Sequence, residues 1–127
     1  MAIDYTALLG LSAGIPVAKA DFDVARDGGA LYEKSVETGI VPSGSIILAS
    51  LVLTKTAFTF VAGGYFAFRV NGLNVGLPSS TLGYQILWLP SAALALVTDK
   101  DTPVVGFVDT SACLTGVAQL WLFYLPT

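Results

Sequence analysis

The side chains that could do chemistry in this chain are few, and none has an obvious partner. Asp21 and Asp23 lie two residues apart, which on a strand would place both carboxylates on one face, where they could bind a hard cation such as calcium. Solvated acids on an edge strand explain the same spacing, and we favour that interpretation. Asp99 and Asp101 flank a lysine in a segment that has the composition of a turn. The sequence therefore predicts no metal site and no cofactor.

Catalysis has little support in the residue types. The chain contains no histidine, so neither its single cysteine, Cys113, nor a serine has the base that usually activates such nucleophiles. Cys113 stands in an apolar segment, where a buried and inert thiol is the common outcome. Glu33 and Glu37 are the only glutamates, and the sequence places neither across a cleft from a second carboxylate. The glycines lack nucleotide-binding spacing. We therefore expect a protein that is not an enzyme.

The composition favours association with other proteins. Of the 127 residues, 54% are hydrophobic and 12% are charged, about half the usual share of charge. A single domain with so little polar surface is expected to bury apolar area against other copies of itself or a larger particle. The net charge of −3 argues against nucleic acid as a partner, because phosphate binding needs a basic face.

Neither a membrane partner nor export is expected. Residues 71–98 and 110–127 carry no charge, but the first stretch is interrupted by prolines and glycines and the second is rich in strand-forming residues. A spanning helix needs about 20 apolar residues without such interruptions. Asp4 stands where a secretory signal carries positive charge. The chain therefore fits synthesis in a reducing cytoplasm.

The elements that would position the notable side chains are strands. Residues 45–54 are apolar on both faces of the pleat, and grouping them by alternation places Ile47 together with Leu51. Residues 119–125 are likewise apolar on both faces. Residues 65–70 alternate most clearly and predict that Phe66, Phe68 and Val70 face inward while Tyr65, Ala67 and Arg69 face outward. Further strands are expected at residues 21–25, 31–36, 84–89, 94–98 and 104–108, with a turn at Asn71-Gly72 and a loop at 73–82.

About eight short strands with turn signals roughly every ten residues predict one all-β domain, a single antiparallel β-sandwich over residues 19–127. Residues 1–18 form an apolar, glycine-punctuated N-terminal arm, which is expected to lie on another surface; a frayed terminus explains it equally well.

Two strands that are apolar on both faces predict an interface in so small a domain. The aromatic residues could form a platform on which sugars stack, but at strand spacing they more often pack in a core or a subunit contact. We expect the interface to include Leu8, Leu9, Leu11, Ile46, Leu48, Trp88, Trp121 and Phe123.

Several segments resemble small virion proteins of tailed bacteriophages. Residues 40–47 and 54–58 resemble the entry to a long apolar strand and the step that follows it in that family. Residues 96–104 look like the family's threonine-rich hairpin, and residues 114–120, which precede Tyr124, look like its closing strand. The likeness spans about residues 38–126, although the strands of the family are often more polar than the two doubly apolar strands here.

The resemblance implies a jelly-roll fold and a capsid decoration (cement) protein, a head-fibre base or a related accessory component. It implies a homo-oligomer, with a trimer favoured, that binds the major capsid protein or other virion proteins. The protein would then be located in the virion, after assembly in the host cytoplasm, and no catalytic residue is transferred. The alternative is a receptor- or carbohydrate-binding sandwich module of a phage fibre or tail.

Overall fold

The computed structural model describes residues 16–88, 96–97 and 100–126, which form strands and one helical turn. Within these ranges no helix has the length and apolar character needed to cross a membrane. The elements are β1 (Val17–Asp23), α2 (Val24–Asp27), β2 (Tyr32–Val41), β3 (Ser45–Phe60), β4 (Tyr65–Val70), β5 (Leu73–Gly76), β6 (Gly83–Trp88), β7 (Leu96–Val97), β8 (Thr102–Asp109) and β9 (Cys113–Leu125).

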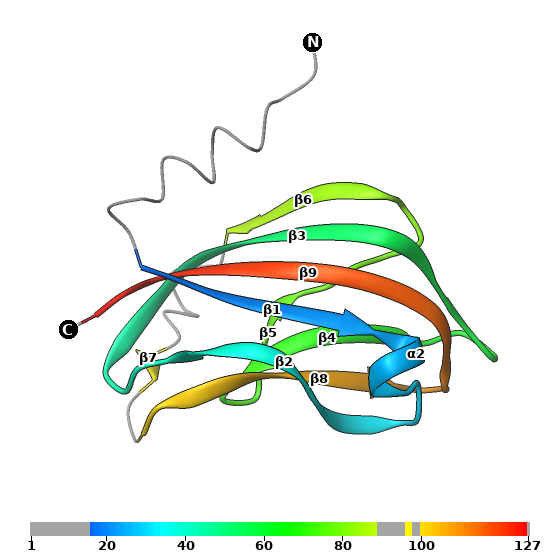
Figure 1. Ribbon diagram of the computed structural model, residues 1–127, viewed down its shortest axis with the longest axis horizontal. Helices are drawn as coiled ribbons and strands as arrows, with labels where there is room; N and C mark the ends of the chain where they lie inside the picture. Colours follow the sequence, from blue (N-terminus) through cyan, green and yellow to red (C-terminus); the bar gives the residue numbers. More distant parts are fainter. Residues whose placement is uncertain (1–15, 89–95, 98–99, 127) are drawn as a thin grey trace, which may run out of the picture.

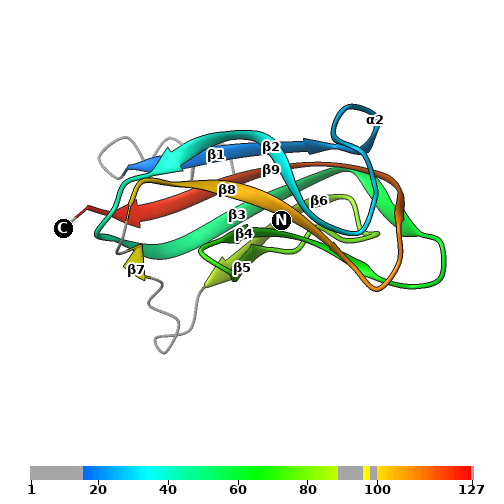
Figure 2. The same cartoon turned by 90° about the horizontal axis from the view of Figure 1, so that it is seen from below.

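The strands pair antiparallel in the order β5-β4-β8-β2-β1-β9-β3-β6, and β7 pairs with β3 (Figure 1). β1 and β2 pair at two register positions, Ala20 with Thr38 and Asp21 with Glu37. The path therefore divides into two halves, β1-β9-β3-β6 and β2-β8-β4-β5, which curl over one another (Figure 2). The chain crosses repeatedly between the halves, and this strand order is that of a jelly roll. The predicted all-β antiparallel sandwich is confirmed.

An aromatic cluster joins the two halves. The ring of Phe22 in β1 stacks on that of Phe66 in β4, with centroids 4.1 Å apart. Phe58 of β3 lies 5.4 Å from the same ring, and Phe68 meets it edge-on at 5.1 Å. Phe66, Phe68 and Val70 are fully buried, so their predicted inward orientation is confirmed.

β3 is one continuous strand that runs to Phe60, whereas the sequence predicts a strand that ends at residue 54. Its register against β9 is irregular between Ile47 and Ala49, so Leu48 occupies a bulge. Ile47 and Val52 both belong to the core cluster, whereas the fully buried Leu51 does not. The simple alternation that groups Ile47 with Leu51 is therefore wrong, because one extra residue reverses the facing of all residues beyond it.

Three smaller expectations also need correction. Val24 and Ala25 lie in α2 and not in a strand, because the Asp23 side chain accepts a hydrogen bond from the Ala25 backbone N–H and caps a helical turn. Ala67 faces away from the core cluster as predicted, but it is fully buried; it pairs with Phe107, and the Arg69 guanidinium lies 3.7 Å above the centre of the Phe107 ring.

The third correction concerns residues 73–82, predicted as a loop, of which Leu73–Gly76 form β5. The Asn71-Gly72 turn has positive φ at both residues, 53° and 80°, which is the geometry that joins two strands into a tight hairpin. β1 begins at Val17, inside the range assigned to the N-terminal arm, and residues 1–15 lie outside the described residues.

Three hydroxyl groups of β3 are buried without a hydrogen-bond partner within the described part of the chain: Ser45, Ser50 and Thr54. Thr54→Val is expected to raise the free energy of unfolding by about 1 kcal/mol, because it removes an unsatisfied buried hydroxyl at nearly constant shape. Urea denaturation measures the change. Thr59→Val is the matched control, since the Thr59 hydroxyl is exposed and lies 2.7 Å from the Thr115 hydroxyl, and no gain is expected there. An equal gain in both variants would contradict the explanation.

Candidate interaction surface

The half-sheet β1-β9-β3-β6 has an outer face that the core does not use. In β9, every second residue within 118–122 belongs to the core, so Trp121 and Phe123 point to the opposite side. Directly paired residues of neighbouring antiparallel strands share a face. Trp121 is paired with Leu51 of β3 and Phe123 with Ala49, so strands distant in sequence build one surface.

The outer face is apolar at one end and polar at the other. Near the start of β1, Val17 pairs with Phe123, and Ile46 of β3 pairs with Leu125. Toward α2 the same strands carry acids and an amide, including the paired Asp21 and Gln119. We call the apolar end the apolar patch; its residues are Val17, Ile46, Ala49, Leu51, Trp121, Phe123 and Leu125. The exposed Lys19 of β1 pairs with Trp121 and borders the patch on the side of α2.

Several large side chains of the apolar patch are in contact with solvent. Leu125 is 49% exposed, and Trp121 and Phe123 are half-buried, whereas Leu51 between them is fully buried. The Tyr84 ring of β6 lies beside that of Trp121, with centroids 6.4 Å apart. Large aromatic side chains that combine apolar area with solvent access are typical of protein contact sites.

The register brings together several residues that the sequence predicts for the interface. Ile46, Trp121 and Phe123 lie in the apolar patch, and Leu48 occupies the adjacent bulge, where it is 38% exposed. Trp88 of β6 pairs with Ala49, which on its other side pairs with Phe123, so the three positions lie side by side across the sheet. Leu8, Leu9 and Leu11 lie outside the described residues. The role of all eight in an interface stays a prediction.

Sequence reasoning missed Val17 and Leu125 as members of this surface. Val17 was assigned to the arm, and Leu125 closes a strand whose two faces look alike in sequence. Strand pairing shows that both residues belong to the patch, because Val17 lies opposite Phe123 and Leu125 lies opposite Ile46. Register of this kind is a tertiary property, and composition alone does not contain it.

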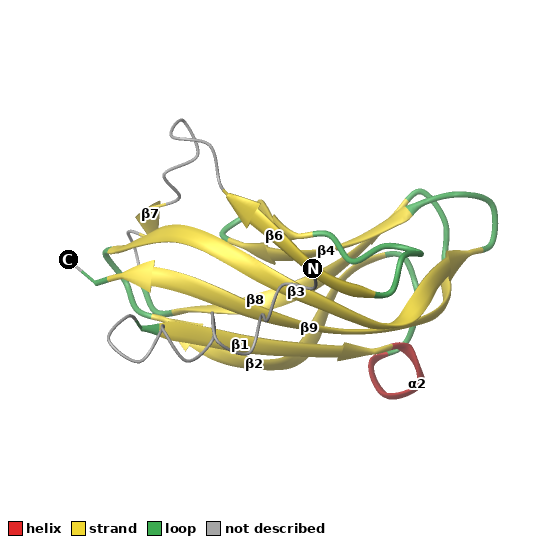
Figure 3. Cartoon of the chain, turned by 90° about the horizontal axis from the view of Figure 1, so that it is seen from above, coloured by secondary structure: helices red, strands yellow, loops and turns green. Residues whose placement is uncertain are grey.

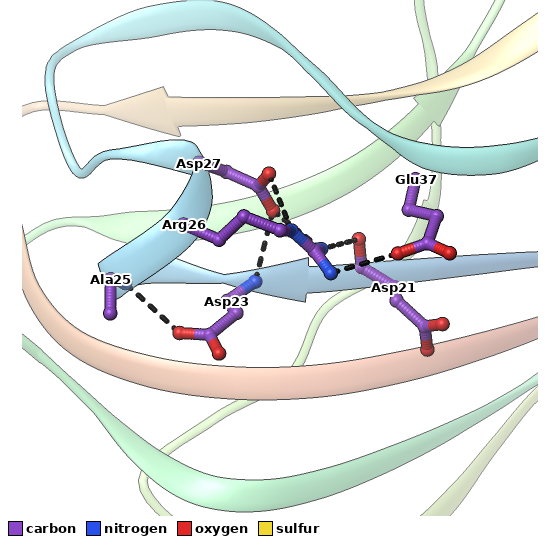
Figure 4. A network of polar contacts seen from close by, with 6 residues as sticks. All are labelled: Asp21, Asp23, Ala25, Arg26, Asp27 and Glu37. Atoms are coloured by element: carbon purple, nitrogen blue, oxygen red, sulfur yellow. Dashed lines mark hydrogen bonds and ion pairs between the residues drawn. The ribbon is translucent and has the colours of Figure 1, made fainter.

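The acidic residues near α2 form a structural network around Arg26 (Figure 4). The Arg26 guanidinium donates to the Asp27 carboxylate at 2.8 and 2.9 Å and to Glu37 at 2.9 Å. It also donates to the backbone carbonyl of Asp21 at 2.9 Å. The Asp23 side chain is used as the cap of α2, so this carboxylate and that of Asp27 are engaged in holding β1, α2 and β2 together.

Asp27 gives this network a pH dependence. Its hydrogen bond with Arg26 holds the pKa of the carboxyl below its usual value, and the Asp23 backbone N–H adds to the effect. A lowered folded-state pKa means that the carboxylate stabilises the fold above its unfolded pKa of about 3.9, and that this stability is lost as the pH falls through the folded value.

Asp27→Asn is therefore expected to cost about 1 kcal/mol of unfolding free energy at neutral pH, a modest value because Arg26 is substantially exposed. The difference from the natural protein should vanish between about pH 5 and pH 2. Urea denaturation across that range is the measurement, and a difference that stays constant with pH would contradict the role given to the carboxylate. Asp101→Asn serves as the control, since Asp101 accepts one exposed backbone hydrogen bond.

Cys113 and Asp101, two of the remaining chemical candidates, make hydrogen bonds to the backbone. Cys113 is buried, which raises the pKa of its thiol, and the thiol donates to the Thr115 carbonyl at 3.2 Å. Asp101 accepts from the Ser43 backbone N–H, and Asp99 lies outside the described residues. Across the described ranges, no group of three or more Cys, Asp or Glu side chains lies close enough together to hold a metal ion.

The chain was compared with known proteins. No protein-family model matches it, and no curated protein matches its sequence. Among solved structures, it is similar to a chain of the cyanophage Pam1 capsid asymmetric unit, with a TM-score of 0.61 and 15% sequence identity. The likeness covers 89% of this chain and 85% of that one. At this identity it concerns the fold, which the two chains share over nearly their whole length.

Proposed function

We propose that this protein is a structural component of a phage virion. In this role it binds to the capsid or another part of the shell and stabilises it as an oligomeric cement or decoration protein. The apolar patch is the observation that carries the proposal, because Trp121, Phe123 and Leu125 present apolar area that a separate subunit would leave in water. The fold that this protein shares with a chain of a phage capsid asymmetric unit supports a place in a virion.

The physical basis would be burial of apolar area, repeated many times around a particle. A standard interface covers about 800 Å² per partner, and apolar area contributes about 25 cal/mol per Å². Much of this gross gain is offset by lost rotational and translational freedom. A contact of moderate affinity still holds a shell together when it recurs, because each further contact forms within an assembly that is already tethered.

In its finer form the proposal is a homotrimer that contacts the major capsid protein or another virion protein. The protein would act by binding, without catalysis and without a cofactor, and would reside in the virion after assembly in the host cytoplasm. The apolar patch would join copies or seat them on the shell, while the polar end near α2, with its charges paired around Arg26, stays in solvent.

Trp121→Lys tests this proposal, because it replaces the largest apolar side chain of the apolar patch with a second charge beside Lys19, which pairs with it. Light scattering of the purified protein and co-sedimentation with capsid shells are the two measurements. The natural protein is expected to form a defined oligomer that sediments with shells. The Trp121→Lys variant is expected either to show a lower oligomer mass in light scattering or to sediment less with shells. Ile40→Lys is the control, since Ile40 is 49% exposed on β2 of the other half-sheet. A natural protein that stays monomeric and ignores shells would overturn the proposal.

A binding module of a phage fibre or tail is the second candidate. The neighbouring rings of Tyr84 and Trp121 favour it, because half-buried aromatic faces on an open sheet are able to stack on sugar rings. A glycan screen in which selective binding is lost on Trp121→Ala, while Ile40→Ala still binds, would replace the cement role with this one.

A further inference from the structure

A hollow of about 330 Å³ opens at the end of the sandwich where β3 passes into β4. Its walls include Phe58 and Phe60 of β3, Tyr65 of β4, and Leu77 and Pro78 of the segment between β5 and β6. No charged side chain lines it. The hollow therefore suits an uncharged, apolar occupant.

Exposed aliphatic residues adjoin the lining residues along the chain or across a strand pair. Leu77 is 42% exposed and Val61, next to Phe60, is 64% exposed. Leu82 follows the lining residues within a few positions and is 62% exposed; Leu114 adjoins Cys113, which pairs with Phe60, and is 57% exposed. A solvent-accessible hollow with apolar walls and exposed aliphatic residues in the adjoining segments is typical of a site for an apolar polypeptide segment.

The hollow is formed before any occupant arrives. The Phe58 backbone N–H donates to the Ser79 carbonyl at 3.1 Å, which holds the β5–β6 segment against β3. Phe58 itself is anchored in the aromatic cluster by Phe22 and Phe66. A preformed site avoids the entropy cost of ordering its own walls on binding.

We propose that this hollow receives Leu8, Leu9 and Leu11 of segment 1–15 from a second copy of the chain. The proposal rests on the oligomeric role proposed above and names the contact that joins the copies. Segment 1–15 contains Leu8, Leu9 and Leu11, and its one charged side chain is Asp4. An apolar segment and an uncharged apolar hollow are complementary.

The three leucines of segment 1–15 fall short of the hollow of their own chain. The segment joins the sandwich at Pro16, whose carbonyl accepts a hydrogen bond from the Tyr124 backbone N–H. The hollow lies beyond the other end of β9, where Cys113 pairs with Phe60, about 35 Å away at roughly 3.3 Å per residue. Leu8 reaches no more than about 29 Å from Pro16 even in a fully extended chain. Figures 1 and 3 show the start of β1 and the β3–β4 turn at opposite ends of the molecule.

The contact is therefore head to tail: each copy offers its segment at one end and its hollow at the other. Such a heterologous contact closes into a ring when the rotation between copies allows it. A three-membered ring would account for the trimer proposed above. It would also occupy a surface separate from the apolar patch, which would stay available to the shell.

Cysteine cross-linking tests the contact directly. The full chain is made with Leu9→Cys and Leu77→Cys together, and Cys113 is kept because its buried thiol is poorly reactive. Mild oxidation is expected to give covalent dimers and higher multimers between chains. Leu9→Cys with Ile40→Cys is the matched control, since Ile40 is exposed on β2, away from the hollow, and this pair is expected to stay uncross-linked.

The possible outcomes separate the two proposals. A link within one chain, or no link in a protein that light scattering shows to be oligomeric, would overturn the head-to-tail contact and leave the oligomer intact. A monomeric natural protein would overturn the oligomeric role itself. As a second measurement, Leu77→Asp is expected to weaken self-association about tenfold or more, with unchanged thermal unfolding because Leu77 is partly exposed.

Discussion

Phe66→Ala is expected to lower the free energy of unfolding by about 3–5 kcal/mol, the range for truncating a buried phenylalanine. Phe66 is fully buried, and its ring contacts the rings of Phe22, Phe58 and Phe68 from both halves of the sandwich. Its removal would leave a cavity at the centre of the packing between β1, β3 and β4. The aromatic neighbours cannot collapse into that cavity without leaving their own packing positions.

Urea denaturation followed by tryptophan fluorescence measures this loss. Tyr32→Ala is the control, because Tyr32 is 63% exposed and removing its ring should cost far less. A loss below about 1 kcal/mol at Phe66 would show that the two halves are not joined through this cluster. A large loss would also lower the yield of folded protein, since a domain of this size has about 5–15 kcal/mol of stability in total.

Gly29→Ala is expected to cost about 2–4 kcal/mol, although it adds a single methyl group. A Cβ atom at Gly29 would lie 1.9 Å from the backbone carbonyl oxygen of Cys113, at the start of β9. The Gly29 carbonyl also accepts a hydrogen bond from the Cys113 backbone N–H at 2.8 Å. The added atom therefore forces two backbones apart and breaks the bond between them, which combines overpacking with the loss of a hydrogen bond.

Gly39→Ala is the matched control in β2. A Cβ atom at Gly39 meets its nearest neighbour, the Lys19 backbone nitrogen, at 3.5 Å, an ordinary contact, so little change is expected. Thermal unfolding of both variants is the measurement. Equal losses at the two positions would show that alanine is unfavourable for a reason unrelated to the approach of Cys113.

The two proposals about assembly use different surfaces of one fold. The apolar patch lies on the outer face of β1-β9-β3-β6, whereas the hollow lies at the end of the sandwich beside the β3–β4 turn. Variants in one surface should therefore leave the other contact intact. The cross-link made by Leu9→Cys and Leu77→Cys is expected to form also in the presence of Trp121→Lys. The Leu77→Asp variant is expected to bind shells even as dissociated subunits.

The sequence by itself determined the strand content and the inward residues of the simplest strand. Alternation placed Phe66 and Phe68 in the core correctly, because the side chains of a strand alternate whatever it pairs with. It also identified residues 45–54 and 119–125 as strands that are apolar on both faces, and Asn71-Gly72 as a turn. The lack of histidine and the scarcity of charge predicted association with other proteins and not catalysis.

Tertiary structure alone decided which face each apolar residue occupies and which distant residues become neighbours. The bulge at Leu48 reassigned Ile47 and Leu51, and no local pattern signals a bulge in a run of uniformly apolar residues. The pairing of β9 with both β1 and β3 gathered the apolar patch from three strands. The hollow needed the β5–β6 segment to lie against β3, a contact made through backbone atoms that every residue type shares. Periodicity is a property of one strand, whereas register and closure depend on energies summed over all of them.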